Sequence, residues 1–231
     1  MDGSEKRKEE RMPNWCSNTL TISGDAIEVL ALMEKASSGE HVLVGPFQGR
    51  IEGYDWGDFT PIQMELFMRD DDLFRDKSDK KSVFSFHAFV PMPREVMLAP
   101  YDSSRLREAA EKYPEWFGRF PDLLSGYDWE HKNWGVKWGA SDAYVSDQGR
   151  TGDCYSVFYD FNTAWGPPIT FMDKLAALYP NLMFSLSYSE EGMNFAGDIE
   201  WRGGVCTEHN ERECDTEEGE EEEEYSKEEE E

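Results

Sequence analysis

The stretch NWGVKWG over residues 133–139 brings indole rings, an amide and an amine together within a short segment. Trp134 and Trp138 stand four positions apart with Lys137 between them, and the two glycines allow tight backbone turns. Aromatic walls with a few converging polar groups are typical of a site for a small ligand or a peptide. With residues of matching type from neighbouring motifs, the candidate binding site comprises Asn14, Trp15, Asp128, Trp129, Asn133, Trp134, Lys137, Trp138 and Trp165.

The same tryptophans can be explained without a ligand. Large aromatic side chains contribute much of the burial where loops pack on a sheet, so they are also expected as anchors for a long insertion. Spacing alone does not distinguish anchors from pocket walls. Asn133 and Lys137 are the informative residues, because an anchoring role for the tryptophans does not require them.

Catalytic chemistry finds little support in the sequence. His87 is the one residue with suitable chemistry in a predicted strand, and a lone strand histidine is more often a hydrogen-bonded structural residue than a base. No serine lies in a nucleophile elbow, no glycine-rich loop matches a phosphate cradle, and no paired carboxylates accompany a histidine at helical spacing. The sequence therefore predicts no catalytic residues and a protein that is not an enzyme.

The cysteines raise the question of a metal. Cys206, His209 and Cys214 are close in sequence, and Cys16 or Cys154 is available as a fourth ligand. Structural zinc sites usually have tighter cysteine pairs, so we expect no metal and no cofactor. Four scattered cysteines in a chain of this size fit reduced thiols better than a disulfide framework.

Charge narrows the possible partners. The 231 residues hold 49 acidic against 23 basic side chains, a net charge of −26, and the C-terminal residues 208–231 are especially acidic. Affinity for nucleic acid comes largely from basic residues that displace counterions from phosphates, so direct nucleic-acid binding is not expected. The acidic balance also disfavours anionic membrane surfaces. No apolar run approaches a membrane-spanning length and the first residues lack a signal-peptide pattern, so a cytoplasmic location is expected.

Hydrophobic periodicity predicts the elements that position these residues. Alternating apolar positions predict strands over 18–23, 82–90, 154–162 and 183–189, with a further strand within 193–202. A helix is expected after the first strand, capped by Asp25, and another after the third strand, begun at a proline. The expected buried stripes of these helices are Ala26, Val29, Leu30 and Met33 in the first, and Phe171, Leu175 and Leu178 in the second.

The order strand, helix, strand, then strand, helix, strand predicts an α+β fold, a ferredoxin-like split βαβ antiparallel sheet with both helices on one face. The other face would then carry Thr19, Thr21, Ser85, His87, Ser156, Asp160, Ser185 and Ser187. An RNA-binding sheet of this topology presents stacking aromatics and basic residues there. Only Phe89 and Phe158 are aromatic candidates on that face and no basic cluster accompanies them, so RNA recognition is not expected.

We expect one domain over residues 12–207, flanked by charged ends. Residues 1–11 read as a disordered leader and 208–231 as a disordered acidic tail, since like charges repel and prevent collapse. Two large insertions are expected, at about 40–81 and 91–153. They contain helices predicted near 63–68, 103–113 and 115–120.

Five ordered motifs carry a family resemblance: MPNWCSNTLTISG (12–24), FHAFVPMP (86–93), DWEHKNWGVKWGA (128–140), FNTAWGPP (161–168) and EEGMNFAGD (190–198). Together they resemble the YubB-like proteins of bacteriophages and conjugative plasmids. The resemblance implies a ferredoxin-like domain, a mobile genetic element in a bacterium, and a chain that starts at Met12. It implies no activity.

Two functions follow as hypotheses. The first is a non-enzymatic accessory protein of a phage or plasmid that binds, and inhibits, a basic host or rival nucleic-acid-binding protein in the bacterial cytoplasm. The acidic tail serves either solubility or mimicry of nucleic acid in this hypothesis. The second is a domain that binds or processes a nucleotide-like small molecule in the tryptophan-rich pocket.

Overall fold

The computed structural model describes residues 14–38 and 82–214. The elements lie along the chain in the order β1 (Trp15–Asp25), α1 (Ala26–Ser38), η3 (Phe86–Ala88), α4 (Arg94–Leu98), α5 (Ser103–Lys112), α6 (Pro114–Phe117), α7 (Gly126–Asn133), β2 (Lys137–Thr151), β3 (Cys154–Ala164), α8 (Ile169–Leu178), β4 (Met183–Glu190), β5 (Phe195–Arg202) and β6 (Val205–Arg212).

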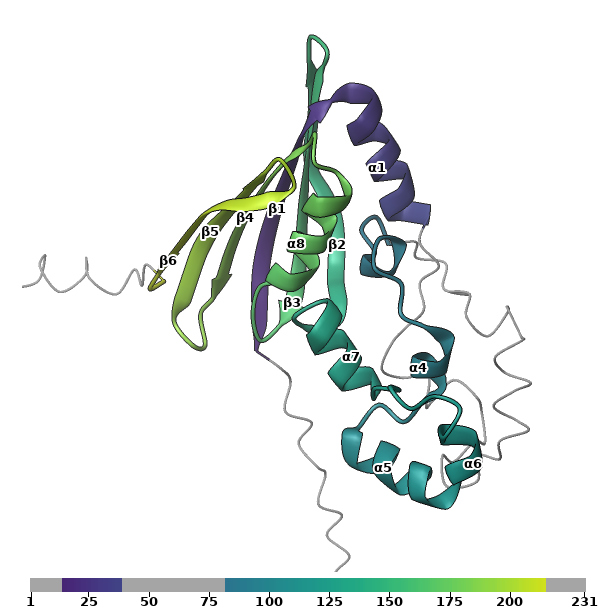
Figure 1. Ribbon diagram of the computed structural model, residues 1–231. Coiled ribbons are helices and arrows are strands. Elements are labelled where there is room, and N and C mark those ends of the chain that lie inside the picture. The colour runs from purple at the N-terminus through teal and green to yellow at the C-terminus, as the bar shows by residue number, and fades with distance from the viewer. Residues whose placement is uncertain (1–13, 39–81, 215–231) are drawn as a thin grey trace, which may run out of the picture.

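The strands form one antiparallel sheet in the order β2-β3-β1-β4-β5-β6. Its first four strands, with α1 after β1 and α8 after β3, make a ferredoxin-like unit, which confirms the predicted fold class. The added strands β5 and β6 widen the sheet beyond β4. Helices α1 and α8 lie on the same face of the sheet (Figure 1).

Local sequence explains how α1 begins. The Asp25 side chain accepts hydrogen bonds from the backbone N–H groups of Ile27 (3.0 Å) and Glu28 (3.2 Å), the predicted cap. Ala26 and Val29 are buried as expected, but Leu30 is 47% exposed and Leu32 takes the buried position. The stripe is therefore rotated from the predicted one.

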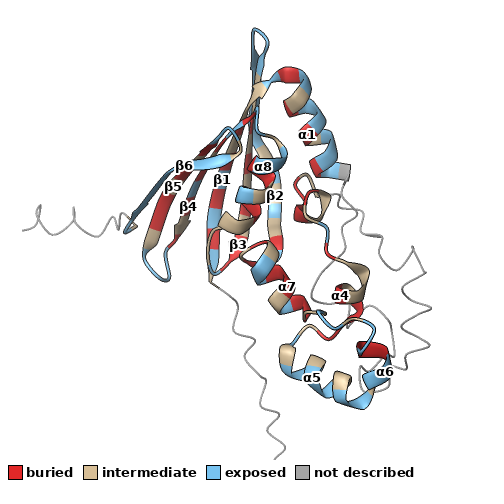
Figure 2. Cartoon of the chain, viewed as in Figure 1, coloured by how far each residue is buried: buried red, intermediate tan, exposed pale blue. Residues whose placement is uncertain are grey.

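The second core helix, α8, shows a similar shift. Phe171 and Leu175 are buried, whereas Leu178, at the last position of the helix, is 53% exposed. Met172 and Ala176 are buried instead. Beneath the helices, every second residue of the central strands is buried, as Figure 2 shows for β1, β3 and β4, and the buried positions include Leu20, Ile22, Val157, Tyr159, Phe184 and Leu186.

The predicted strand over 82–90 is wrong. This segment contains η3, and its aromatic side chains enter the core instead of pairing with the sheet. The Phe86 ring stacks on Phe171 with centroids 3.8 Å apart, and Phe84 stacks on Tyr159 at 4.8 Å. A period of two predicts alternate burial, but Phe84, Ser85 and Phe86 are buried in succession, because the two rings pack on β3 and α8 without strand pairing. Ser85 and His87 therefore do not lie on the open sheet face.

The strand that takes this place is β2, inside the segment predicted as the insertion 91–153. Its side chains are mostly exposed, and its pairing with β3 shifts register several times. An exposed, bulged edge strand has no regular apolar alternation, so the sequence pattern did not reveal it. The predicted boundary between two insertions at residues 82–90 is accordingly wrong, and β2 belongs to the sheet.

The insertion before β2 has its own small core. The predicted helices over 103–113 and 115–120 correspond to α5 and α6, and Asp102 caps α5 by accepting from the backbone of Ser104 and Arg105. Trp116 and Phe117 form a separate hydrophobic cluster there. Within residues 14–38 and 82–214, no helix is long and apolar enough to cross a membrane.

The acidic tail begins later than expected. Residues 208–212 lie in β6 and pair with β5, so the part of the tail prediction that covers them is wrong. The leader 1–11, the insertion 40–81 with its helix near 63–68, and residues 215–231 lie outside the described residues.

Gly197 tests the close packing of β5 between its neighbours β4 and β6. A methyl group at this position would lie 2.5 Å from Cζ of Tyr188 in β4 and 2.6 Å from the Asn210 carbonyl oxygen of β6, whereas one at Gly149 of β2 would meet nothing within 4 Å. We expect Gly197→Ala to lower the free energy of unfolding by about 1–3 kcal/mol through overpacking. Gly149→Ala, the matched control, should change it by less than about 0.5 kcal/mol. Urea unfolding measures both, and equal effects would contradict the close packing at Gly197.

Candidate functional site

The face of the sheet opposite α1 and α8 is polar. In cross-strand register, Thr19 of β1 lies beside Asp160 of β3 on one side and Ser187 of β4 on the other. No helix of the described residues covers this open face (Figure 1). Of the residues expected there, the strand pairing places these on the open face: Thr19, Thr21, Ser156, Asp160, Ser185 and Ser187.

A groove of about 470 Å³ crosses the open face. Hydroxyl, amide and carboxylate groups line it, and the bulged part of β2 and the end of β6 contribute to its walls. Its volume falls in the range of ligand-binding clefts. The side chains that matter below are Ser17, Thr19, Asp142, Tyr144, Asp160, Asn162 and Arg212.

The groove is anionic. The Thr19 hydroxyl donates to Asp160 at 2.7 Å. Burial acts to raise the pKa of Asp160, but hydrogen bonds from the hydroxyls of Thr19, Ser146 and Tyr144 outweigh it and hold that pKa below its usual value. This carboxylate is consequently ionised at neutral pH.

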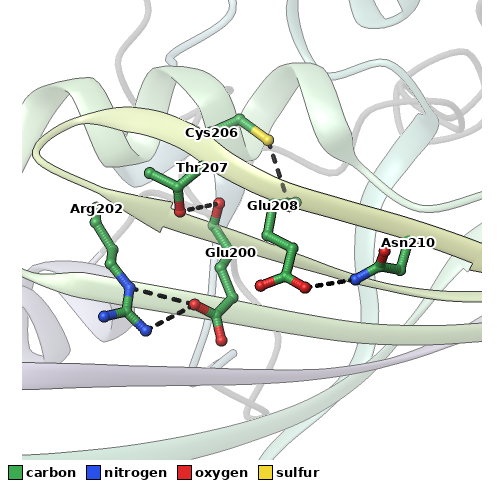
Figure 3. Close-up of polar contacts among 6 residues, drawn as sticks. All are labelled: Glu200, Arg202, Cys206, Thr207, Glu208 and Asn210. Atoms are coloured by element: carbon green, nitrogen blue, oxygen red, sulfur yellow. Dashed lines mark hydrogen bonds and ion pairs between the residues drawn. The ribbon is translucent and has the colours of Figure 1, made fainter.

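Two cations of the open face, Arg202 and Arg212, are paired with carboxylates. Asp198 accepts from the Ser187 hydroxyl at 2.5 Å and forms an ion pair with Arg212, and these two contacts lower its pKa. Arg202 donates twice to Glu200, at 2.8 and 3.2 Å (Figure 3). The positive charges nearest the groove are therefore neutralised within the sheet.

Polar contacts continue to the outer strand. Figure 3 shows the Thr207 hydroxyl donating to the Glu200 carbonyl at 3.3 Å and the Asn210 amide donating to Glu208 at 2.7 Å. The first contact joins β6 to the backbone of β5, and the second holds an acidic side chain within β6. The open face is thus a continuous polar surface from β2 to β6.

The tryptophan-rich candidate site divides into two groups. Trp129 and Trp134 are buried in the core, where the Trp134 indole donates to the Val90 carbonyl at 3.0 Å. Asp128 accepts from the hydroxyls of Ser103 and Ser125 at the start of α7. These contacts are those of anchors for the insertion.

Asn133 also belongs to this internal group. Its amide donates to the Trp129 carbonyl at 3.0 Å, and its carbonyl accepts from Lys174 of α8 at 2.7 Å. The residue therefore links α7 to α8. Asn133, Asp128, Trp129 and Trp134 are all committed to contacts within the fold.

The other group comprises three exposed tryptophans, and Trp15 lies at one end of the open face, on the same side of β1 as Ser17 and Thr19. Trp15, Trp138 and Trp165, called the aromatic platform below, are 40%, 39% and 47% exposed. Strand pairing places Trp15 and Lys137 on either side of Ala164. The rings of Trp15 and Trp138 are 6.3 Å apart, and the Trp165 backbone N–H donates to the Asn14 carbonyl at 2.9 Å.

Two of the three platform residues, Trp138 and Trp165, have a strained backbone. Trp138 and Trp165 have φ values of 64° and 72°, in the left-handed region that bulky side chains rarely adopt. Such conformations cost of order 1–3 kcal/mol each and concentrate at functional sites. Lys137 lies over the rings of both Tyr127 and Trp138, with 5.3 Å from its amine to each centroid.

A buried carboxyl group stands behind Trp138. Glu130 is fully buried, and its Oε2 accepts from the Tyr101 hydroxyl at 2.6 Å. Burial raises the pKa of Glu130 to about 7, although the Tyr101 hydroxyl, the Trp138 backbone and the Lys137 charge all act to lower it. Sequence reasoning missed this residue because nothing in DWEHKNW distinguishes a buried glutamate from an exposed one.

The groove was also missed as a cavity. Asp160 was expected on the open face, but Asp142, Tyr144 and Arg212 reach the groove through bulges in β2 and through β6, neither of which the sequence pattern revealed. No group of three or more His, Cys, Asp or Glu side chains within 14–38 and 82–214 could hold a metal ion. Cys206 and Cys214 contact backbone carbonyl groups instead.

Comparison with known proteins agrees with the fold. The strand order and the two helices define the fold class as that of ferredoxin-like domains. A family model described as the ferredoxin-like domain in Api92-like protein matches residues 133–228 of this chain. The crystal structure of protein Api92 from Yersinia pseudotuberculosis is 14% identical, with a TM-score of 0.46, and the match covers 89% of this chain and all of that one. No curated protein matches.

Glu130 predicts a pH dependence of stability. Its folded pKa of about 7 lies above the ordinary value of 4.5, so its contribution to stability is greatest below pH 4.5 and is lost as the pH rises through 7. Between these pH values the wild type should lose on the order of 3 kcal/mol of unfolding free energy. Glu130→Gln cannot ionise and should not show this loss, so its stability relative to wild type should increase as the pH rises. Urea unfolding at pH 5 to 8 measures this.

Tyr101→Phe provides the matched control. It removes the hydroxyl that lowers the pKa of Glu130, so the loss of stability should extend to higher pH. A difference between wild type and Glu130→Gln that stays constant with pH would contradict the assignment.

Proposed function

We propose that this chain is a non-enzymatic interaction protein that binds a basic partner protein through its open sheet face. The anionic groove carries the proposal: Asp142 and Asp160 line it, and Arg212, the cation at its edge, is paired with Asp198. Potentials of opposite sign steer association and suppress wrong partners. A protein that normally binds nucleic acid presents the complementary basic surface.

An inhibitory role fits this chemistry. Carboxylates fixed on a sheet can occupy the basic surface that a partner uses for phosphates, which would block nucleic-acid binding by competition. The motif resemblance to YubB-like proteins of phages and plasmids supports an accessory role in a mobile genetic element, with a host or rival nucleic-acid-binding protein as partner in the bacterial cytoplasm. The family description names a fold and no activity.

Charge-neutral variants test the proposal. We expect nuclease-treated bacterial lysate to yield a specific basic partner with the full chain, and Asp142→Asn/Asp160→Asn to lose it. Asn tolerates the left-handed conformation that Asp142 adopts at φ 52°, so the backbone is preserved. Glu108→Gln/Asp122→Asn, the matched control, removes the same charge from exposed positions of the insertion and should keep the partner.

Salt and truncation complete the experiment. Capture that weakens with increasing salt supports an electrostatic interface, and capture indifferent to salt counts against it. A chain that ends after Cys214 keeps β6 and removes residues 215–231. If this chain retains the partner, the fold binds and the tail serves solubility.

A nucleotide-like small molecule is the second candidate, favoured by the exposed rings of Trp15 and Trp138 beside Lys137. Stacking on an indole with a nearby amine suits a base and a phosphate. A ligand at 100 times its dissociation constant should stabilise the protein by about 2.7 kcal/mol. Thermal unfolding with a nucleotide panel checks this, with Lys137→Gln as the variant that should lose the shift. No shift with any nucleotide would remove this candidate.

A further inference from the structure

The groove and the aromatic platform belong to one surface. Ser17 and Asn162 line the groove, and each stands two residues along its strand from the pair Trp15 and Ala164. In a strand, residues two apart share a face. The aromatic end of the open face is therefore continuous with its anionic part.

The irregular start of β2 supplies residues to both parts. Trp138 of the platform and Asp142 of the groove both have left-handed φ values, 64° and 52°. The pairing with β3 shifts register between Lys137 and Ser141 and again between Ser141 and Tyr144. Bulges re-aim side chains and are common beside functional sites. The strain of this segment therefore helps to set the directions of the Trp138 ring and of the Asp142 carboxylate, which lines the groove.

Resting on the proposed function, we propose that the open face binds an extended basic segment of the partner, with one arginine or lysine side chain on the platform and a second at Asp160. The face of an indole ring attracts cations. Lys137 already occupies such a position against Trp138, while Trp15 and Trp165 keep exposed surface for a cation from the partner.

The negative charge of the groove favours a basic side chain over a nucleotide as the ligand. A nucleotide stacked on the platform and extending along the face would bring its phosphates toward Asp142 and Asp160, where like charges repel. A basic side chain meets the opposite charge at Asp142 and Asp160. The Thr19 hydroxyl fixes one Asp160 oxygen at 2.7 Å, and this orients the carboxylate for a donor.

The strand geometry sets the spacing of the two basic residues. Asp160 lies level with Thr19, four residues along β1 from Trp15, which is ~13 Å at the rise of an extended strand. An extended partner segment covers this distance in four residues, and residues i and i+4 lie on the same side. Residues three apart point to opposite sides. The surface should therefore prefer two basic residues at i and i+4.

Fluorescence anisotropy with labelled peptides tests this preference. The probe is a twelve-residue Ser/Thr-rich peptide with two arginines four residues apart, compared with the same composition spaced three apart and with a citrulline version that keeps the shape without the charge. We expect the i, i+4 peptide to bind at least about fivefold more tightly than either control peptide. Equal binding of the two arginine spacings would overturn the inference.

Protein variants assign the two subsites. Trp15→Ala and Asp142→Asn/Asp160→Asn should each weaken the i, i+4 peptide at least about fivefold, and Trp15→Phe should weaken it less. Ile27→Ala, which removes an exposed apolar side chain from α1, should have no effect. Thermal unfolding establishes that each variant is folded. If Trp15→Ala does not fold, Trp15→Phe still tests the role of this side chain.

The outcomes separate this inference from the proposed function. If peptides of any spacing bind and only the aspartate variant loses them, the platform has no part and the inference fails while the anionic interface stands. If no basic peptide binds even at low salt and lysate capture also fails, both fall. Competition by mononucleotides or neutral oligosaccharides that depends on Trp15 would assign the platform to that ligand and overturn the inference.

Discussion

The central position of β1 is the constraint on which the rest of the structure depends. This strand pairs with β3 on one side and β4 on the other, so its register fixes both neighbours. Because side chains alternate along a strand, placing Leu20 and Ile22 under the helices forces Ser17 and Thr19 onto the open face. A slip of one residue would exchange the two sets, so the hydrophobic core and the polar groove specify each other.

Strand β2, at the edge of the sheet, is irregular where the central strand β1 is regular. An edge strand has one free side, so it can accept bulges without breaking the ladder on which the core depends. Its strained residues cost stability that the aromatic core beneath α1 and α8, with Phe84 against Tyr159 and Phe86 against Phe171, can offset. The conformational cost is concentrated where the platform and the groove meet.

The predictable parts of this fold are those in which burial and secondary structure have the same period. Strands β1, β3 and β4 and helix α8 follow this rule. The ferredoxin-like topology was inferred from them together with the first helix and a strand over 82–90, and β2 takes the place of that wrong strand. The segment over 82–90 breaks the rule, since its aromatic alternation reflects packing against Phe171 and Tyr159. Strand β2 is the opposite case: it is a strand without alternating apolar residues, because most of its side chains are exposed.

The candidate site was partly predictable for the same reason. Alternation in β1 and β3 placed Thr19 and Asp160 on one face, but the depth of the groove depends on bulges and on β6, which local patterns do not encode. Among the tryptophans, composition could not separate Trp134, which fills the core, from Trp138, which a left-handed backbone turns outward. Whether each tryptophan is buried or exposed depends on tertiary packing around Glu130 and Tyr101.

The pairing of charges on the open face argues for a partner rather than for solubility alone. A solubilising surface needs only dispersed charge. Here Asp198 holds Arg212, Glu200 holds Arg202, and three hydroxyls stabilise the ionised form of Asp160. The result is a fixed array in which the cations are neutralised and Asp142 and Asp160 line the groove. Preorganised carboxylates lose little freedom when a basic segment binds, and this lowers the entropic cost of association.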